Sequence, residues 1–400
     1  MLISVKKLHN KTLFFSLLIS ILLIQILSFP QENIAERYIV KDNRYGNNPA
    51  VSKDDINEQF CCEKDGQKVY LFTLTNKNGL VAKISNYAGA IYELDVPDRN
   101  GKLSNVVLGL KSLKEYFGPN PHFGALIGRF SNRIANAEFT LDGVTYHLTA
   151  NSMKKHSIHG GKIGFDKIVW NPDTMMTENG PALKLTHLSP DGHEGFPGNL
   201  KVTAIYTLTN DNALRLDYYA ETDKPTVVNF TNHNYFNLAG EGKGNILNHI
   251  IMINADKYTP ADNEGIPTGE IKNVEGTPYD FRKAHAIDSL MDKLPHGYDI
   301  NYVLNHPLNK LGLAAKVSDP LSGRVLEVYT TEPGMQFYTA NGFNGRFSGR
   351  SGGKYESCAG FALETEHYPD SPNKPNFPST VLRPDEKFHS ITIFKFSATK

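Results

Sequence analysis

The chain has 400 residues, of which 40% are hydrophobic and 21% are charged, the proportions of an ordinary globular protein. Its 42 basic and 42 acidic side chains cancel, and a formal net charge of zero argues against nucleic acid as a partner. Only Cys61, Cys62 and Cys358 are cysteines, which excludes a disulfide framework and a zinc-binding spacing. A single bridge from Cys61 or Cys62 to Cys358 stays open.

The first 29 residues have the pattern of a targeting segment. Lys6, Lys7 and Lys11 precede an almost wholly apolar run over residues 13–29, as in a secretory signal peptide. We therefore expect entry into the secretory pathway and an extracellular location. The run approaches the length that spans a bilayer, and Ser28-Phe29-Pro30 lacks a small-x-small cleavage pattern. An uncleaved single-pass membrane anchor is thus the alternative.

Residues 30–67 are polar and charged and contain few apolar side chains. This composition predicts a flexible or loosely docked linker, an N-terminal extension outside the fold. The composition changes after residue 67, and no second linker follows. We therefore expect residues 68–400 to form one domain.

Short β-rich runs separated by turn dipeptides fill this domain. Asn100-Gly101 and Asp142-Gly143 are typical hairpin dipeptides, and residues 201–209 and 213–220 flank Asn210-Asp211-Asn212 as a further hairpin. Helical patterns are scarce, with residues 112–117 and 284–293 as the best short candidates. The pattern predicts an all-β fold, an antiparallel sandwich or barrel. Other strands are expected at residues 69–75, 81–87, 90–96, 105–108, 226–231, 246–254, 324–331, 336–340, 360–366 and 388–397.

His233 lies in a segment dense in amides and aromatics, Thr-Asn-His-Asn-Tyr-Phe-Asn-Leu over residues 231–238. If this segment is extended, Thr231, His233 and Tyr235 share one face. Histidine is the side chain best suited to transfer a proton near neutral pH, so His233 is a candidate acid or base.

Glu364 lies in a strand-like apolar run between residues 361 and 366. A carboxylate buried there must be paired, hydrogen-bonded or functional, because burying it bare is costly. A solvent-facing position on an alternating strand is the simpler alternative.

His159 precedes two glycines, which allow a backbone to approach a ligand closely. Together with His156 it resembles half of a metal site, but no third ligand stands at a matching spacing, so no metal is expected. A structural histidine is the alternative.

A further group of polar side chains completes the candidate site. Asp280 and Arg133 are candidate members. The alternative role for Asp280 is turn capping, and the alternative for Arg133 is a structural ion pair. Amide, guanidinium, imidazole and carboxylate groups make directional hydrogen bonds to hydroxyls, and aromatic faces pack on sugar C–H surfaces. The combination predicts a site for a neutral polyol that needs no cofactor. Its additional members are Asn132, Arg133, Asp280 and Gln336.

Seven segments follow one another in a characteristic order between about Val69 and the C-terminus. They lie at residues 128–134 (Gly-Arg-Phe-Ser-Asn-Arg-Ile), 159–161 (His-Gly-Gly), 193–198 (His-Glu-Gly-Phe-Pro-Gly), 231–238, 277–282 (Thr-Pro-Tyr-Asp-Phe-Arg), 332–338 (Glu-Pro-Gly-Met-Gln-Phe-Tyr) and 363–365 (Leu-Glu-Thr). In this order the chain resembles the aldose 1-epimerase, or galactose mutarotase, family. The resemblance implies a large β-sandwich of the galactose mutarotase-like type with a sugar groove on one concave face.

The resemblance also implies roles and partners. Glu364 would be the general base at the anomeric hydroxyl, and His233 the general acid at the ring oxygen, with His159 supporting charge there. The implied substrate is a monosaccharide, with no cofactor, metal or nucleotide, and the protein is expected to be a monomer or weak dimer. A membrane is a partner only if the N-terminal segment is retained. The implied ligands of the sugar hydroxyls are Asn132, Arg133, Asp280 and Gln336.

Three other functions remain open at this point. A glycoside hydrolase would pair Asp280 with Glu364 at a defined separation. A hexose-6-phosphate epimerase would need further basic side chains for the phosphate. A non-catalytic carbohydrate-binding protein could dispense with Glu364 or His233. The sequon at Asn229 lies beside His233, and we expect it to be inaccessible and unmodified.

Overall fold

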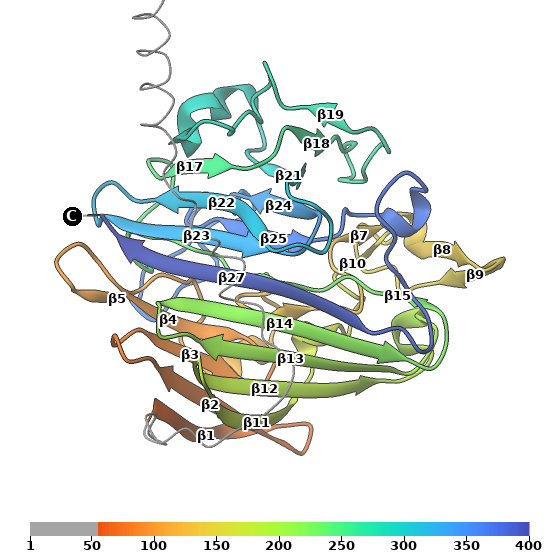
Figure 1. Ribbon diagram of the computed structural model, residues 1–400, viewed down its shortest axis with the longest axis horizontal. Helices are drawn as coiled ribbons and strands as arrows, with labels where there is room; N and C mark the ends of the chain where they lie inside the picture. Colours follow the sequence, from red (N-terminus) through yellow and green to blue (C-terminus); the bar gives the residue numbers. More distant parts are fainter. Residues whose placement is uncertain (1–54, 400) are drawn as a thin grey trace, which may run out of the picture. The chain divides into compact units, whose positions relative to one another are not determined.

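The computed structural model describes residues 55–399, which form antiparallel sheets joined by turns and short 3-10 helices (Figure 1). The expected all-β sandwich is therefore confirmed. The segment expected to be a signal peptide or anchor and most of the expected linker lie outside the described residues. Across residues 55–399 no helix has the length and apolarity needed to cross a membrane.

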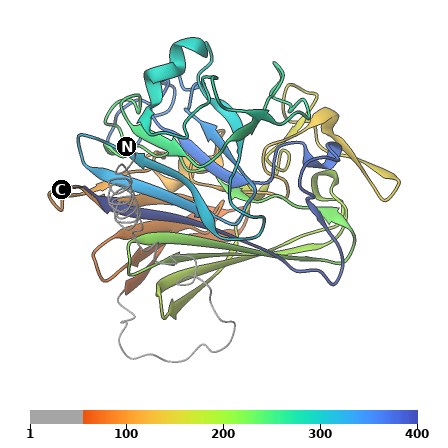
Figure 2. The same ribbon diagram turned by 45° about the horizontal axis from the view of Figure 1, so that its top comes forward.

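The largest sheet has nine strands, and its long strands lie side by side in both views (Figures 1 and 2). The expected hairpin is confirmed, because β13 (Leu200–Leu208) pairs with β14 (Ala213–Thr222) around Asn210-Asp211-Asn212. Val202, Ala204, Tyr206 and Leu208 share one face and are buried, whereas residues 201, 203 and 205 on the other face are more exposed, as the period of two requires. In order across the sheet the strands are β11 (Asn171–Thr177), β12 (Gly180–Ser189), β13 (Leu200–Leu208), β14 (Ala213–Thr222), β27 (Phe388–Ala398), β23 (Arg324–Thr330), β22 (Gly312–Ser318), β17 (Ile250–Ile253) and β20 (His285–Ala286).

A five-stranded sheet begins the fold, and it begins earlier than expected. Residues 56–64 were expected to belong to the linker, but they pair with residues 67–74 across the turn at Asp65-Gly66. The expectation of a linker over these residues was wrong because this edge strand is mostly solvent-facing and therefore polar. The strands are β1 (Ile56–Lys64), β2 (Gln67–Thr75), β3 (Val81–Ser85), β4 (Ile91–Pro97) and β5 (Leu103–Asn105).

The cysteine bridge that the sequence left open is absent from the described residues. Cys61, Cys62 and Cys358 are all free thiols. The first two are neighbours on β1, with their sulfur atoms 2.7 Å apart.

A second five-stranded sheet packs with the first against the nine-stranded sheet. Leu185 and Leu214 of the large sheet belong to one buried cluster with Phe72 of the first small sheet and Phe337 and Leu363 of the second. This apolar layer holds the sandwich together. The strands of the second small sheet are β19 (Lys272–Asn273), β18 (Lys257–Thr259), β21 (Asp299–Val303), β24 (Gly334–Tyr338) and β25 (Ala362–Glu366).

Short two-stranded ladders and 3-10 helices complete the fold. Both sequence-predicted helical segments appear, as η2 (Leu113–Phe117) and η6 (Ile287–Lys293). The other helices among residues 55–399 are η3 (Ala135–Ala137), η4 (Phe165–Lys167), η5 (His193–Gly195) and η7 (Ser371–Asn373). The ladders pair β6 (Leu126–Ile127) with β16 (Thr231–Asn232), β7 (Arg133–Ile134) with β10 (Ser157–Ile158), β8 (Glu138–Leu141) with β9 (Val144–His147), and β15 (Thr226–Val227) with β26 (Val381–Leu382).

Candidate active site

Three neighbouring strands of the second small sheet carry a row of polar side chains. Glu364 on β25 pairs with Gln336 on β24, which pairs with Asn301 on β21. Directly paired residues project to the same face of a sheet. Phe337 and Leu363, one residue along, project to the opposite face and join the apolar core. The row therefore faces away from the core between the sheets.

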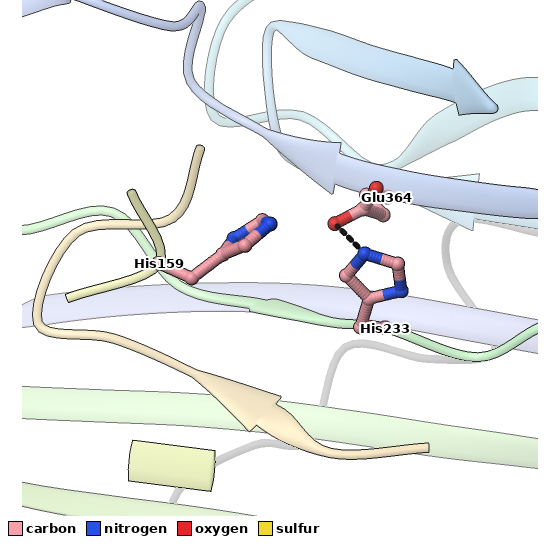
Figure 3. A group of neighbouring side chains, drawn as sticks. All are labelled: His159, His233 and Glu364. Carbon is pink, nitrogen blue, oxygen red and sulfur yellow. Dashed lines mark ion pairs between the residues drawn. The ribbon is translucent and has the colours of Figure 1, made fainter. Parts of the chain in front are cut away.

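His233 is delivered to this face by the backbone of a neighbouring segment. It directly follows β16, its N–H donates to the carbonyl of Ala125, and its carbonyl accepts from the N–H of Gly124. Its ring reaches Glu364, with Nε2 lying 3.6 Å from the carboxylate Oε2 (Figure 3). Both side chains are buried, with residue exposures of 4% and 3%. A histidine and a carboxylate thus meet in a site shielded from bulk water.

His159 faces the same point from the loop after β10 (Figure 3). The backbone N–H of Asn132 donates to its Nδ1 at 3.2 Å, and its own N–H donates to the carbonyl of Asn132. Because Nδ1 accepts a hydrogen bond, the proton of the neutral ring is on Nε2. His159 therefore presents a hydrogen-bond donor to the site.

Gly160 makes this placement possible. Its φ is +83°, and a Cβ at this position would lie 1.9 Å from the carbonyl oxygen of Gly128. Only glycine combines that backbone angle with so close an approach. The glycines after His159 thus serve backbone packing as well as the turn.

The donor atoms of His159, His233 and Glu364 lie within 4.8 Å of one another, close enough to hold a metal ion. Two histidines and a carboxylate are a set that zinc accepts. A metal needs a free lone pair on each nitrogen, however, and His159 carries its proton on the nitrogen that faces the site. The group is better suited to a ligand oxygen than to a cation.

Burial controls the protonation of the His233–Glu364 pair. Burial, followed by the charges of Glu366 and Asp299, raises the pKa of Glu364 well above its usual range, whereas Arg133 lowers it. Burial lowers the pKa of His233 to about 3. Each ion alone is disfavoured, so the pair holds one proton between its two members at pH values between the lowered pKa of His233 and the raised pKa of Glu364.

The predicted hydroxyl ligands Asn132, Arg133 and Gln336 gather beside the pair. Arg133 and Gln336 line one hollow with Asn301. The side-chain amide of Asn132 donates to Glu366 at 2.9 Å, and burial raises the pKa of that carboxyl to about 8. These contacts hold the polar rim of the site in place.

Asp299 belongs to this group, and the sequence analysis missed it. Its Oδ1 accepts a hydrogen bond from Gln336 at 2.6 Å, and its Oδ2 lies 4.0 Å from the guanidinium of Arg133. Asp299 also lines a neighbouring hollow of about 580 Å³. No local sequence signal marks Asp299, because its place at the first residue of β21, in register with the residues around Gln336, is set by the sheet.

Asp280, predicted as a hydroxyl ligand, is not part of the group. The carbonyl of Tyr279 accepts from the hydroxyl of Tyr302, and Phe281 packs on Phe337, both of which project to the core side of the sheet. Asp280 therefore lies across the sheet from Glu364. Its carboxylate accepts hydrogen bonds from Arg282 at 2.8 and 2.9 Å, the turn-stabilising role that was its alternative.

Several buried polar atoms in the site lack a hydrogen-bond partner among the described residues. They are Nδ1 of His233, Oε2 of Glu364, Oε1 of Gln336 and Nε of Arg133. Buried polar groups in proteins are nearly always hydrogen-bonded. Their concentration at one place fits a ligand that both donates and accepts several hydrogen bonds.

Comparison with known proteins gives a consistent result. The model of the aldose 1-epimerase family matches residues 70–395. Galactose mutarotase of Mus musculus is 46% identical over 319 residues, covering 80% of this chain and 91% of that protein. Aldose 1-epimerase of Escherichia coli (strain K12) is 39% identical over 350 residues, covering 86% of this chain and 99% of that protein.

Solved structures show the same architecture. An aldose epimerase homologue from C. elegans superimposes with a TM-score of 0.76 at 26% identity, covering 82% of this chain and 99% of that one. Galactose 1-epimerase from Lactobacillus acidophilus NCFM superimposes with a TM-score of 0.76 at 29% identity, covering 86% and 99%.

Proposed function

Because the chain belongs to the aldose 1-epimerase family and is an isomerase that interconverts the α and β anomers of aldohexoses, we propose that Glu364 and His233 are the groups that move its protons. The observation that supports this is the buried contact between them, 3.6 Å across a face lined with hydroxyl-binding side chains. A base and an acid held so close act on two oxygens attached to the same carbon.

The reaction opens a cyclic hemiacetal and closes it again. Glu364 takes the proton from the hydroxyl on C1 while His233 gives a proton to the ring oxygen, and the C1–O5 bond breaks. The aldehyde turns about C1–C2 and closes from its other face, with the two roles reversed. Both residues return to their starting states. Each positioned proton-transfer group contributes about 10²–10⁴-fold.

One shared proton is the protonation state that this chemistry needs. A sugar hydroxyl that donates to Glu364 favours the ionised carboxylate, as the nearby Arg133 also does. The proton then resides on His233. His159, whose Nε2–H faces the site, stabilises negative charge that develops near the ring oxygen.

Galactose and glucose are the proposed substrates, and the side chains around the pair are their proposed ligands. Several relatives bear the name galactose mutarotase. Arg133 offers donors, Gln336 offers its unpartnered Oε1 and Asp299 its carboxylate as acceptors, and Asn132 is fixed at the edge of the site. Such directional groups bind neutral sugar hydroxyls.

The competing functions fit these residues less well. A glycoside hydrolase built on Asp280 and Glu364 would need the two carboxylates to flank one bond, but they lie on opposite faces of a sheet. A sugar-phosphate epimerase would need several basic groups. Among the described residues that line the hollow beside Gln336, Arg133 is the only basic side chain.

We also propose that the protein enters the secretory pathway through its first 29 residues, with membrane anchoring as the alternative. The buried sequon agrees with an unmodified Asn229, which is fully inaccessible and donates from its side-chain amide to the carbonyl of His367. Mass spectrometry of the secreted protein would give the mature N-terminus and detect any glycan at Asn229.

Replacement of the acid tests the proposal. His233→Gln removes the proton donor and should lower the rate of α-D-galactose anomerisation, followed by polarimetry, by about 100-fold or more. Asp142→Asn is the matched control, because Asp142 forms an exposed ion pair with Arg383. A His233→Gln enzyme as fast as this control would remove His233 from the mechanism.

A further inference from the structure

A third histidine, His122, lies against the catalytic cluster and takes no part in the mechanism above. Its ring centre lies 4.8 Å from that of His159 and 5.7 Å from that of His233, and these two rings are 5.3 Å apart. The three imidazoles therefore form a triangle in which each ring touches the other two. His122 is the outermost, with 28% of its side chain exposed.

The backbone at His122 adopts a left-handed conformation, with φ of +61°. For a residue other than glycine this conformation costs roughly 1–2 kcal/mol. Such strain persists only where the surroundings hold it, and it clusters at functional sites. The segment that follows His122 is the one that hydrogen-bonds the backbone of His233, so the ring and its neighbour are fixed by the same piece of chain.

The carboxylate of Asp166 contacts the ring of His122 and fixes its orientation. Its Oδ2 lies 2.7 Å from Nδ1 of His122 and 2.6 Å from Nζ of Lys167. The carboxylate is buried, and burial alone would raise its pKa, but the hydrogen bonds and charges of His122 and Lys167 bring the pKa below its usual value. Asp166 is therefore an ionised carboxylate inside the site.

This negative charge acts on the proposed acid. Asp166 raises the pKa of His233, in opposition to burial and to His122, which lower it. Burial lowers the pKa of His159, and the positive charges of Arg133 and Lys167 lower it further. The charged and titratable groups around the triangle include Asp166, Lys167, Arg133, Glu364 and Tyr235, whose ring centre lies 4.8 Å from that of His233.

We propose that His122 and Asp166 form a positioning dyad, in which Asp166 orients the ring of His122, His122 fixes the rings of His159 and His233, and the charge of Asp166 supports the cationic form of His233. The proposal rests on the roles assigned above to His233 and Glu364. Neither member of the dyad bonds covalently or exchanges its proton with the sugar.

Three substitutions separate the parts of the dyad. Asp166→Asn removes the charge but keeps the shape. His122→Phe keeps a ring against the two histidines but removes the hydrogen bond to Asp166. His122→Asn keeps a donor near the position of Nδ1 but removes the ring. Asp142→Asn, an exposed carboxylate with the same change, is the control.

We expect Asp166→Asn and His122→Phe to lower kcat for α-D-glucose anomerisation about 10-fold or more, as loss of a histidine-orienting partner does elsewhere, with KM changed less than about 3-fold. Loss of the Asp166 charge disfavours the protonated His233–Glu364 pair. Both limbs of the pH–rate profile of Asp166→Asn should therefore move to lower pH, by about half a unit or more. His122→Asn should keep its limbs closer to those of wild type than Asp166→Asn does.

The result that overturns the dyad is a His122→Phe or Asp166→Asn enzyme that folds, judged by its circular dichroism and melting temperature, and keeps the wild-type kcat and profile. A rise in KM at constant kcat also overturns it, because His122 would then only contact the substrate. Glu364→Gln, measured alongside, separates the two levels. If Glu364→Gln retains full activity the proposed function fails, whereas loss in Glu364→Gln without loss in the dyad variants refutes the dyad alone.

Discussion

Replacement of Gly160 by alanine should strongly lower kcat without unfolding the protein. A Cβ at this position would lie 1.9 Å from the carbonyl oxygen of Gly128, whereas an ordinary contact needs about 3.4 Å, so one of the two segments must move by roughly 1.5 Å. The segment that moves carries His159. A displacement of about 1 Å in a catalytic group costs on the order of 100-fold in rate.

Gly143→Ala is the matched control for this substitution. Gly143 has nearly the same backbone angle, φ of +80° against +83°, but its Cβ would meet nothing within 4 Å. In both variants the positive φ should lower the free energy of unfolding, measured in urea, by roughly 1–2 kcal/mol. Only Gly160→Ala should lose kcat, by about 100-fold in polarimetry. Equal kcat values for the two variants would refute the reasoning that ties His159 to this close approach.

Three further results are expected. The pH–rate profile should be bell-shaped, because the pair works with one proton. On the acid limb, below pH 6.5, Glu364 and His233 take up a second proton. On the alkaline limb, above pH 4.5, they lose the shared proton. A profile that is flat from acid to alkaline pH would contradict the pairing. Asp299→Ala should raise KM for galactose about 10-fold or more through the loss of a hydroxyl ligand, whereas Asp280→Ala should leave KM unchanged in the same assay. The reverse ranking would restore the sequence-based choice. Arg129→Met should lower the free energy of unfolding by about 3 kcal/mol, since buried carbonyls of Pro197 and Gly198 lose their donor; a change below about 1 kcal/mol in urea denaturation would contradict this.

The sequence predicted those parts of the fold whose signal is local. The hairpin of β13 and β14 follows from alternating apolar residues around a polar turn, and both helical segments appear at the expected places. The strand β1 was missed because an edge strand that faces solvent has the composition of a linker. Its Asp65-Gly66 turn was the one local signal that pointed to a hairpin.

The site shows where local signals end. Asp280 and Asp299 each follow a tyrosine and precede an apolar residue, so the sequence does not distinguish them. The sheet distinguishes them: Asp280 lies on the core side of β21 and β24, and Asp299 lies on the side of Glu364. The contact between His233 and Glu364 likewise depends on strands far apart in the chain, which only the folded arrangement brings together.

The most direct test of the mechanism is the rate at which freshly dissolved α-D-glucose and α-D-galactose reach anomeric equilibrium, followed by polarimetry with wild type and Glu364→Gln. The substitution preserves the shape of the side chain and removes the base. Wild type should accelerate anomerisation, and this acceleration should fall by about 100-fold or more in the variant, with sugar binding retained. A variant that accelerates anomerisation as well as wild type would contradict the assignment of Glu364 as the base.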